Sequence, residues 1–200
     1  MSPSPLAVLG LLQLPHRGSA TTLEAQAFQR LKGFLESQGI PVQEIPFRGV
    51  WSYGPELLLI SLLLGLAPVS PVFPLLGALG FFLYFNGWRP WGSLLDRYPS
   101  HNLLAWKGQG AKALVLMAHV DTAKTFFLYH PKRVKAFRAN FLLNAALAFA
   151  APLLALTPLR WPVGLYFLAQ AALLLHRELK APYVEAVSYT HLTLPTKRIV

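Results

Sequence analysis

Two long stretches without charged residues constrain the fold of this chain more than any other feature. Residues 57–88 contain no Asp, Glu, Lys, Arg or His, and residues 139–175 contain only Arg160. Spanning the hydrocarbon core of a membrane takes about 20 apolar residues. Charged residues make up 13% of the chain, whereas soluble domains carry about 25%. We therefore expect an integral, multi-pass membrane protein rather than a soluble fold with a large core.

Each apolar stretch has a break near its middle that predicts a helical hairpin. One straight helix over residues 57–88 would be about 48 Å long, which exceeds a hydrocarbon core of about 30 Å. Pro68 and Pro71 interrupt this stretch, and Pro158 and Pro162 interrupt the second one. The chain is thus expected to contain about four membrane helices. These cover residues 53–67, 72–88, 141–157 and 161–175.

The basic residues are concentrated between the two apolar regions. The net charge is +10, and residues 89–138 hold nine Lys or Arg residues and two acidic ones. Membrane proteins keep such segments in the cytoplasm, so we expect the soluble part to lie on the cytoplasmic side of a bacterial inner or cell membrane. The run from Lys132 to Arg138 is expected to contact anionic lipid headgroups. A nucleic-acid partner is not expected, because it would require a soluble basic face with interleaved aromatic residues.

The remaining segments have the pattern of a soluble α/β domain. Residues 21–39 predict an amphipathic helix, with the spacing of a capping box at its start and a glycine at its end. Residues 40–48 look extended, and their two prolines would confine that strand to the edge of a sheet. Residues 102–106 are a short apolar run, and residues 113–118 are a longer one. The longer run is typical of a strand buried on both faces.

His119 and Asp121, which follow this run, form the candidate site. Residues i and i+2 of a strand point to the same side. A histidine can offer one ring nitrogen to a metal ion while a nearby carboxylate holds the other. The pattern alone is weak, because six His and eight acidic residues give about 0.24 such pairs by chance. A structural role for His119 therefore stays open. His16-Arg17 is interpreted as a turn that could line a substrate site.

The order of these elements resembles the front of a zinc exopeptidase domain. The family is the aminopeptidase and glutamate carboxypeptidase group, family twenty-eight of the metallopeptidases. The resemblance covers about residues 1–50 and 100–123, and its most specific part is Leu114-Val-Leu-Met-Ala-His-Val-Asp-Thr122. It implies an α/β domain with a mixed central sheet and two zinc ions, Zn²⁺ being the expected cofactor. It also implies that His119 is a zinc ligand and that Asp121 is the catalytic-site carboxylate that orients it.

The later motifs of that family do not follow Thr122. The chain contains neither a Gly-x-x-Asp-Asn segment nor a Glu-Glu pair, and a catalytic zinc site takes three protein ligands. We therefore expect the N-terminal portion of a membrane-bound zinc aminopeptidase that hydrolyses peptides, with these 200 residues inactive by themselves. Two alternatives remain open. One is a non-catalytic membrane scaffold or receptor with the peptidase fold, and the other is a small transporter or assembly subunit.

The expected domain organisation has five segments. A peptidase-like helix and strand are followed by the first membrane hairpin, then by peptidase-like strands with the basic segment, then by the second hairpin and a truncated tail. Their bounds are 1–50, 51–91, 92–138, 139–176 and 177–200. Residues 188–200 resemble translated primer or adapter sequence that recurs at the ends of unrelated sequences.

Overall fold

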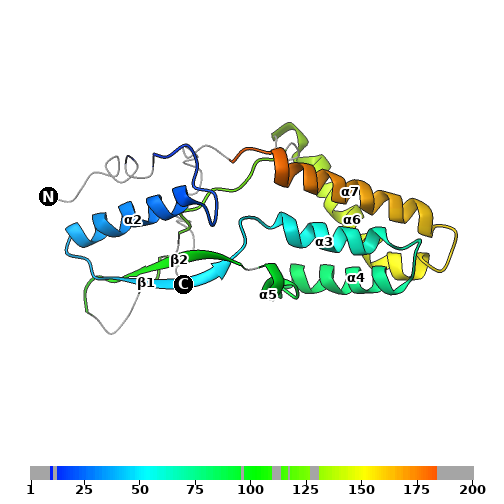
Figure 1. Cartoon of the computed structure of the whole chain (residues 1–200), viewed down its shortest axis with the longest axis horizontal. Coiled ribbons are helices and arrows are strands. Elements are labelled where there is room, and N and C mark those ends of the chain that lie inside the picture. Colours follow the sequence, from blue (N-terminus) through cyan, green and yellow to red (C-terminus); the bar gives the residue numbers. More distant parts are fainter. Residues whose placement is uncertain are drawn as a thin grey trace. The chain divides into compact units, whose positions relative to one another are not determined.

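The computed structural model describes residues 10, 13–95, 97–109, 114–116, 118–126 and 131–183. The expectation of an α/β fold is confirmed, because these residues form helices and a small two-stranded sheet (Figure 1). The chain divides into two compact units. Unit 1 comprises 1–51, 98–123 and 183–200, and unit 2 comprises 52–97 and 124–182. The expected artefactual tail, residues 188–200, lies outside the described residues.

Unit 1 contains helix α2, Thr22–Ser37, whose ends follow the sequence signals. The Thr21 hydroxyl accepts a hydrogen bond from the Glu24 N–H at 3.3 Å. The Glu24 carboxylate in turn accepts one from the Ala20 N–H at 2.6 Å. The helix ends at Ser37. Gly39, two residues later, has a φ of 67°, a left-handed conformation that glycine adopts without steric cost. The predicted helix is therefore confirmed together with its start and stop.

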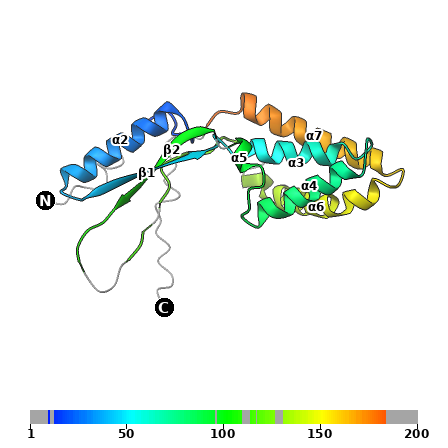
Figure 2. The ribbon, with the colours of Figure 1, turned by 60° about the horizontal axis from the view of Figure 1, so that its bottom comes forward.

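Strands β1, Val42–Gly49, and β2, Tyr98–Ala105, form the antiparallel pair of unit 1. Helix α2 lies along one face of this pair (Figure 2). Phe28 is buried at this contact, and its ring centroid lies 5.3 Å from that of His101 on β2. The predicted extended segment at residues 40–48 is confirmed. It pairs with a strand that follows the whole first apolar stretch in the sequence.

The predicted buried strand over residues 113–118 is wrong for the residues that the structure describes. Leu114, Val115 and Leu116 lie outside regular secondary structure, and their exposed fractions are 77%, 75% and 71%. A strand buried on both faces needs neighbouring strands and a layer above and below. The described part of unit 1 offers one helix and one pair of strands, so the expected mixed central sheet is replaced by a single antiparallel pair. Ala113 and Met117 are outside the described residues.

Unit 2 is helical, and four of its helices lie side by side (Figures 1 and 2). The helices are interrupted near the predicted prolines, at Pro68 and Pro71 between α3 (Gly54–Gly65) and α4 (Val72–Phe85), and at Pro158 between α6 (Val134–Leu154) and α7 (Arg160–Lys180). Pro162 was also expected to interrupt the second stretch, but it lies in the first turn of α7. Helix α6 begins earlier and α7 ends later than expected, because Lys and Arg are good helix formers and extend both helices beyond the apolar run. The other elements of unit 2 are the short helix α5, Gly92–Leu95, and the 3-10 turn η2, Pro131–Arg133.

Small residues allow the helices of unit 2 to approach closely. A Cβ atom added to Gly164 would lie 2.7 Å from Pro68 Cδ, and one added to Gly77 would lie 2.8 Å from Leu64 Cγ. Such contacts between small residues and a neighbouring helix are typical of membrane helix packing. The buried core beside them consists of Ile60, Leu64, Phe81, Ala148, Ala151, Val163 and Phe167.

The expectation of about four membrane helices is not met. In the part of the chain that the structure describes, Lys135–Leu154 is the one helical segment that is long and apolar enough to cross a membrane. Helices α3 and α4 have 12 and 14 residues, which corresponds to about 18 and 21 Å. Both are shorter than a hydrocarbon core of about 30 Å. Helix α7 has 21 residues, but Arg160, Gln170 and His176 lower its hydropathy.

Two glycines of unit 1 provide a matched test of the α2 assignment. An added Cβ would meet nothing within 4 Å at either Gly33 or Gly39, but only Gly39 has a positive φ. Gly33→Ala is expected to stabilise the helix by about 0.5–1 kcal/mol, whereas Gly39→Ala is expected to destabilise it by about 1 kcal/mol. Native-state hydrogen exchange of the α2 amides measures both changes. Shifts of the same sign would contradict this assignment of the helix end.

Candidate functional site in unit 1

The predicted pair, His119 and Asp121, is brought together in the structure. His119 Nδ1 lies 3.4 Å from Asp121 Oδ1 and 3.1 Å from the backbone oxygen of Asp121. The side chains are 64% and 38% exposed, so a ligand from solvent can reach them. With the proton on Nδ1, the lone pair resides on Nε2, which is the form that a histidine metal ligand takes. The geometry is therefore compatible with the orienting role expected for Asp121.

A clamp from the N-terminal turn holds the segment that carries this pair. The Thr122 N–H donates to the Arg17 carbonyl at 2.8 Å, and the Arg17 N–H donates to Thr122 Oγ1 at 2.9 Å. The Arg17 Nε–H also donates to the Val120 carbonyl at 2.7 Å. Gly18 and Thr122 form a parallel bridge here. The sequence predicted a turn at Arg17, but not that its side chain would position the site.

Glu24 adds a second carboxylate near the site. Its side chain accepts a hydrogen bond from the Ser100 hydroxyl at 3.1 Å and borders a cavity of about 220 Å³ that His101 also lines. Burial raises the pKa of Glu24. Hydrogen bonds from Ala20 and Ser100 oppose that rise, and the charge of Asp121 adds to it. The capping-box pattern identified Glu24 as a helix cap, whereas its electrostatic coupling to Asp121 depends on tertiary structure.

The donor set does not fit the two-zinc centre that the family resemblance implies. Among the described residues, no three His, Cys, Asp or Glu side chains are close enough together to hold a metal ion. A catalytic zinc ion requires three protein ligands and an open position. His119 and Asp121 provide one imidazole and one carboxylate. The arrangement can therefore present a single ligand and its orienting partner, and it supports no complete catalytic step by itself.

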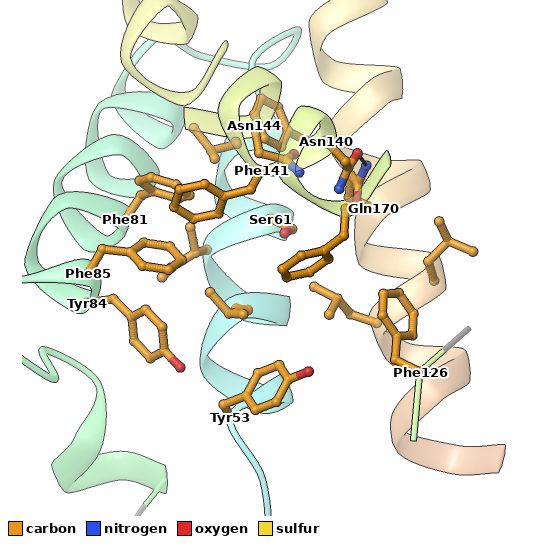
Figure 3. A pocket seen from close by; sticks show the side chains of 17 residues that line it. Tyr53, Ser61, Phe81, Tyr84, Phe85, Phe126, Asn140, Phe141, Asn144 and Gln170 are labelled. Carbon is orange, nitrogen blue, oxygen red and sulfur yellow. Dashed lines mark hydrogen bonds between the residues drawn. The ribbon is translucent and has the colours of Figure 1, made fainter. Parts of the chain in front are cut away.

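A second candidate site, which sequence reasoning missed, lies within unit 2. A half-open cavity of about 510 Å³ is lined mainly by aromatic and aliphatic side chains of α3, α4, α6 and α7 (Figure 3). Besides the hydroxyls of Tyr53 and Tyr84, its polar lining consists of Ser61, Asn140, Asn144 and Gln170. Asn140 and Asn144 are four residues apart and therefore share a helix face. This spacing of amide residues within an apolar stretch was the available signal.

Neither a protein-family profile, nor a curated protein, nor a solved structure matches this chain. The peptidase resemblance therefore rests on the residues of this chain alone.

The raised pKa of Glu24 predicts a pH dependence of stability. The folded state binds this proton more tightly than the unfolded chain does, where the pKa has its ordinary value of 4.5. The free energy of unfolding of unit 1 is therefore expected to decrease as the pH rises from 4.5 through the higher pKa that Glu24 has in the folded state. Glu24→Gln keeps the capping hydrogen bonds and should remove this loss.

The measurement is hydrogen exchange of the α2 amides between about pH 4 and about pH 7, after correction for the intrinsic exchange rate. Glu36→Gln, on the exposed side of the same helix, is the matched control and should keep the original pH profile. A Glu24→Gln profile identical to that of the unchanged chain would contradict the assignment.

Proposed function

We propose that this chain is part of a membrane-bound, zinc-dependent aminopeptidase-like enzyme. In this proposal unit 2 lies in the bilayer and unit 1 belongs to a cytoplasmic domain that acts on peptides. The main support is the division of the chain. Residues 1–51 and 98–123 fold into one unit although an apolar stretch separates them, and that stretch packs with the next one into a different unit.

The surface of unit 2 supports its placement in a membrane. Large apolar side chains are exposed at the two helical turns, with Val69 at 70%, Leu153 at 72% and Leu156 at 72%. The most apolar window of the spanning helix is only 11% buried within the protein. Soluble monomers rarely expose contiguous apolar patches beyond a few hundred Å². In a bilayer, lipid chains would cover this surface, so its apolar side chains would not be exposed to water.

The charges of unit 2 support an orientation. Glu56 at the start of α3 pairs with Arg89 after α4, at 3.1 Å. Arg177 and Glu178 pair at the end of α7, at 2.6 Å. Ionic groups thus gather where the helices begin and end, whereas Arg160 is the one charged residue between residues 139 and 175. The positive-inside rule then favours the cytoplasm for the charged end.

The short helices α3 and α4 fit this proposal as a hairpin that enters the bilayer beside the longer pair. Apolar segments of about 10–14 residues occur as re-entrant segments, and such segments are tolerated where protein surrounds them. The buried residues Ile60 and Leu64 of α3 belong to the core shared with α6 and α7. The proposal therefore keeps four helices in the membrane, of which α6 crosses it fully.

A second candidate function has a specific observation in its favour. The described residues contain no group of three metal-binding side chains, as expected of a peptidase-like fold that serves as a membrane scaffold or receptor. Zinc binding distinguishes the two functions, because only the enzyme needs His119 as a ligand.

Cysteine labelling tests the membrane placement. The chain contains no natural cysteine, so Gln109→Cys and Thr157→Cys each introduce one label site. Gln109→Cys should react with a membrane-impermeant maleimide from the cytoplasmic side, and Thr157→Cys from the opposite side only. Labelling of both positions from the same side would refute the proposed crossing by α6.

Zinc binding and hydrolysis test the enzyme. In membranes that contain the complete gene product, hydrolysis of aminoacyl-anilides should be sensitive to a chelator and lost in His119→Ala. Asp121→Asn should weaken zinc affinity by about 10–100-fold, since it removes the group that orients the ligand. His176→Ala, an exposed histidine of unit 2, is the control. The 200-residue chain should show no turnover, and zinc affinity unaffected by His119→Ala would refute the enzyme.

A further inference from the structure

The candidate pair of unit 1 depends on the backbone that carries it. The side chains of His119 and Asp121 reach solvent, so packing does little to fix their rotamers. Their segment also lies outside the helices and the two strands of the described chain. A site keeps its geometry only when supporting contacts hold the residues that form it. For this pair, those contacts include the hydrogen bonds of Arg17 with Val120 and Thr122.

The turn that contains Arg17 is itself packed against an aromatic ring. The ring centroids of His16 and Tyr183 lie 4.4 Å apart, and the two planes are inclined by 22°, as in a stacked pair. A Cβ atom added to Gly18 would overlap Tyr183 Cε1 and would lie 2.5 Å from Tyr183 Cζ. The tyrosine ring therefore lies directly against the backbone of Gly18, which is buried. Only a residue without a side chain leaves room for the ring at this position.

Gly18 connects the tyrosine ring to the segment of the site. Its N–H donates a hydrogen bond to His16 Nδ1 at 3.2 Å, and Gly18 forms the parallel bridge with Thr122. The stacked ring and the site segment thus contact the same three-residue turn. A shift of this turn would change the position of the Arg17 backbone and, with it, both backbone hydrogen bonds to Thr122.

Tyr183 comes from the opposite end of the described chain. Helix α7 ends at Lys180, and Tyr183 follows three residues later. The carbonyl of the intervening Pro182 accepts hydrogen bonds from the Thr125 N–H at 2.8 Å and from the Thr125 hydroxyl at 2.9 Å. The residue before Tyr183 therefore holds the chain just after the site segment. The segment is anchored on both sides, at Thr122 and at Thr125.

We propose that Tyr183 is a positioning residue of the His119–Asp121 pair. Its ring holds the turn of His16, Arg17 and Gly18 in the conformation from which Arg17 binds the site segment. The effect on a zinc ligand rests on the proposed function, whereas the effect on the pair itself requires no zinc. The site is thus complete only after the chain has passed through unit 2 and returned to unit 1.

Hydrogen exchange at the Thr122 amide of the 200-residue chain tests the contact, because this N–H donates to the Arg17 carbonyl. Tyr183→Ala should accelerate the exchange about 2–12-fold, the range expected for the loss of an aromatic pair, and Tyr183→Phe should retain the protection. Gly18→Ala should act like Tyr183→Ala, because the new Cβ displaces the ring. The two changes combined should then be no worse than Tyr183→Ala alone.

Gly33→Ala is the matched control for Gly18→Ala. An added Cβ meets nothing within 4 Å there, so Thr122 exchange should remain unchanged. Gly18→Ala keeps the tyrosine side chain and replaces Tyr183→Ala if that variant does not fold by circular dichroism. Unchanged Thr122 exchange in the folded variants would overturn the proposal. Equal acceleration in Tyr183→Phe would also overturn it, because the stacked ring would then not be the cause.

The tautomer of His119 provides a readout that a general loss of stability would not change. Above about pH 8 the imidazole is neutral, and ¹⁵N NMR shifts report which ring nitrogen carries the proton. The unchanged chain should carry it on Nδ1, which faces Asp121. Tyr183→Ala should shift the balance toward that of Asp121→Asn, and Tyr183→Phe should not. A balance unchanged in Tyr183→Ala would contradict a positioning role.

Zinc affinity separates a failure of this inference from a failure of the proposed function. In membranes that contain the complete gene product, Tyr183→Ala should weaken zinc binding by less than the about 10–100-fold expected for Asp121→Asn. Affinity that is lost in His119→Ala but unchanged in Tyr183→Ala would refute the positioning role alone. Affinity that is unaffected by His119→Ala would refute the enzyme, and Thr122 exchange and the His119 tautomer would still decide whether Tyr183 positions the pair.

Discussion

A buried charge network at one end of unit 2 connects the points where the chain enters and leaves this unit. Arg177 Nη1 lies 2.6 Å from Glu178 Oε1, and Arg177 Nη2 donates to the Lys124 carbonyl at 3.1 Å. The Ser52 hydroxyl donates to the same Glu178 oxygen at 2.8 Å, and the guanidinium lies 4.3 Å from the centre of the Tyr53 ring. Loss of one partner from such a buried network costs about 3–5 kcal/mol. The network therefore fixes the start of α3 and the end of α7 relative to the segment that leads into α6.

This network explains how one chain can build two units from alternating segments of its sequence. Each apolar insertion must return to the end where it started, so it forms an even number of helices with a turn between them. Pro68 and Pro71 lie in one turn, and Pro158 lies in the other, between Leu154 and Arg160. The turns carry apolar residues, whereas Glu56 and Arg89 pair at the opposite end. The separation of charged and apolar ends thus follows from chain connectivity and is consistent with a bilayer.

Local signals in the sequence predicted the local structure correctly. Contacts between residues that are distant in the sequence could not be predicted in this way. The Thr21 cap, the stop at Gly39 and the proline breaks act within one or two helical turns, so they can be recognised without tertiary structure. The apolar run at Leu114 has the composition of a buried strand, but burial depends on neighbours that the described residues do not provide. The Arg17 clamp joins residues 105 positions apart. The length of the apolar runs likewise led to the expectation of about four membrane helices, whereas α3 and α4 have only 12 and 14 residues.

If unit 2 lies in the membrane as proposed, its amide residues argue against a purely anchoring role. An anchor needs only apolar side chains, and each polar group within it adds a desolvation cost. Asn140, Tyr166 and Gln170 satisfy part of their hydrogen bonding among themselves, and Asn144 extends the same face by one turn of α6. Asn140, Asn144 and Gln170 border a cavity whose other lining residues are mostly apolar. A hydrophobic core that keeps both a cavity and polar side chains is less stable than a filled one.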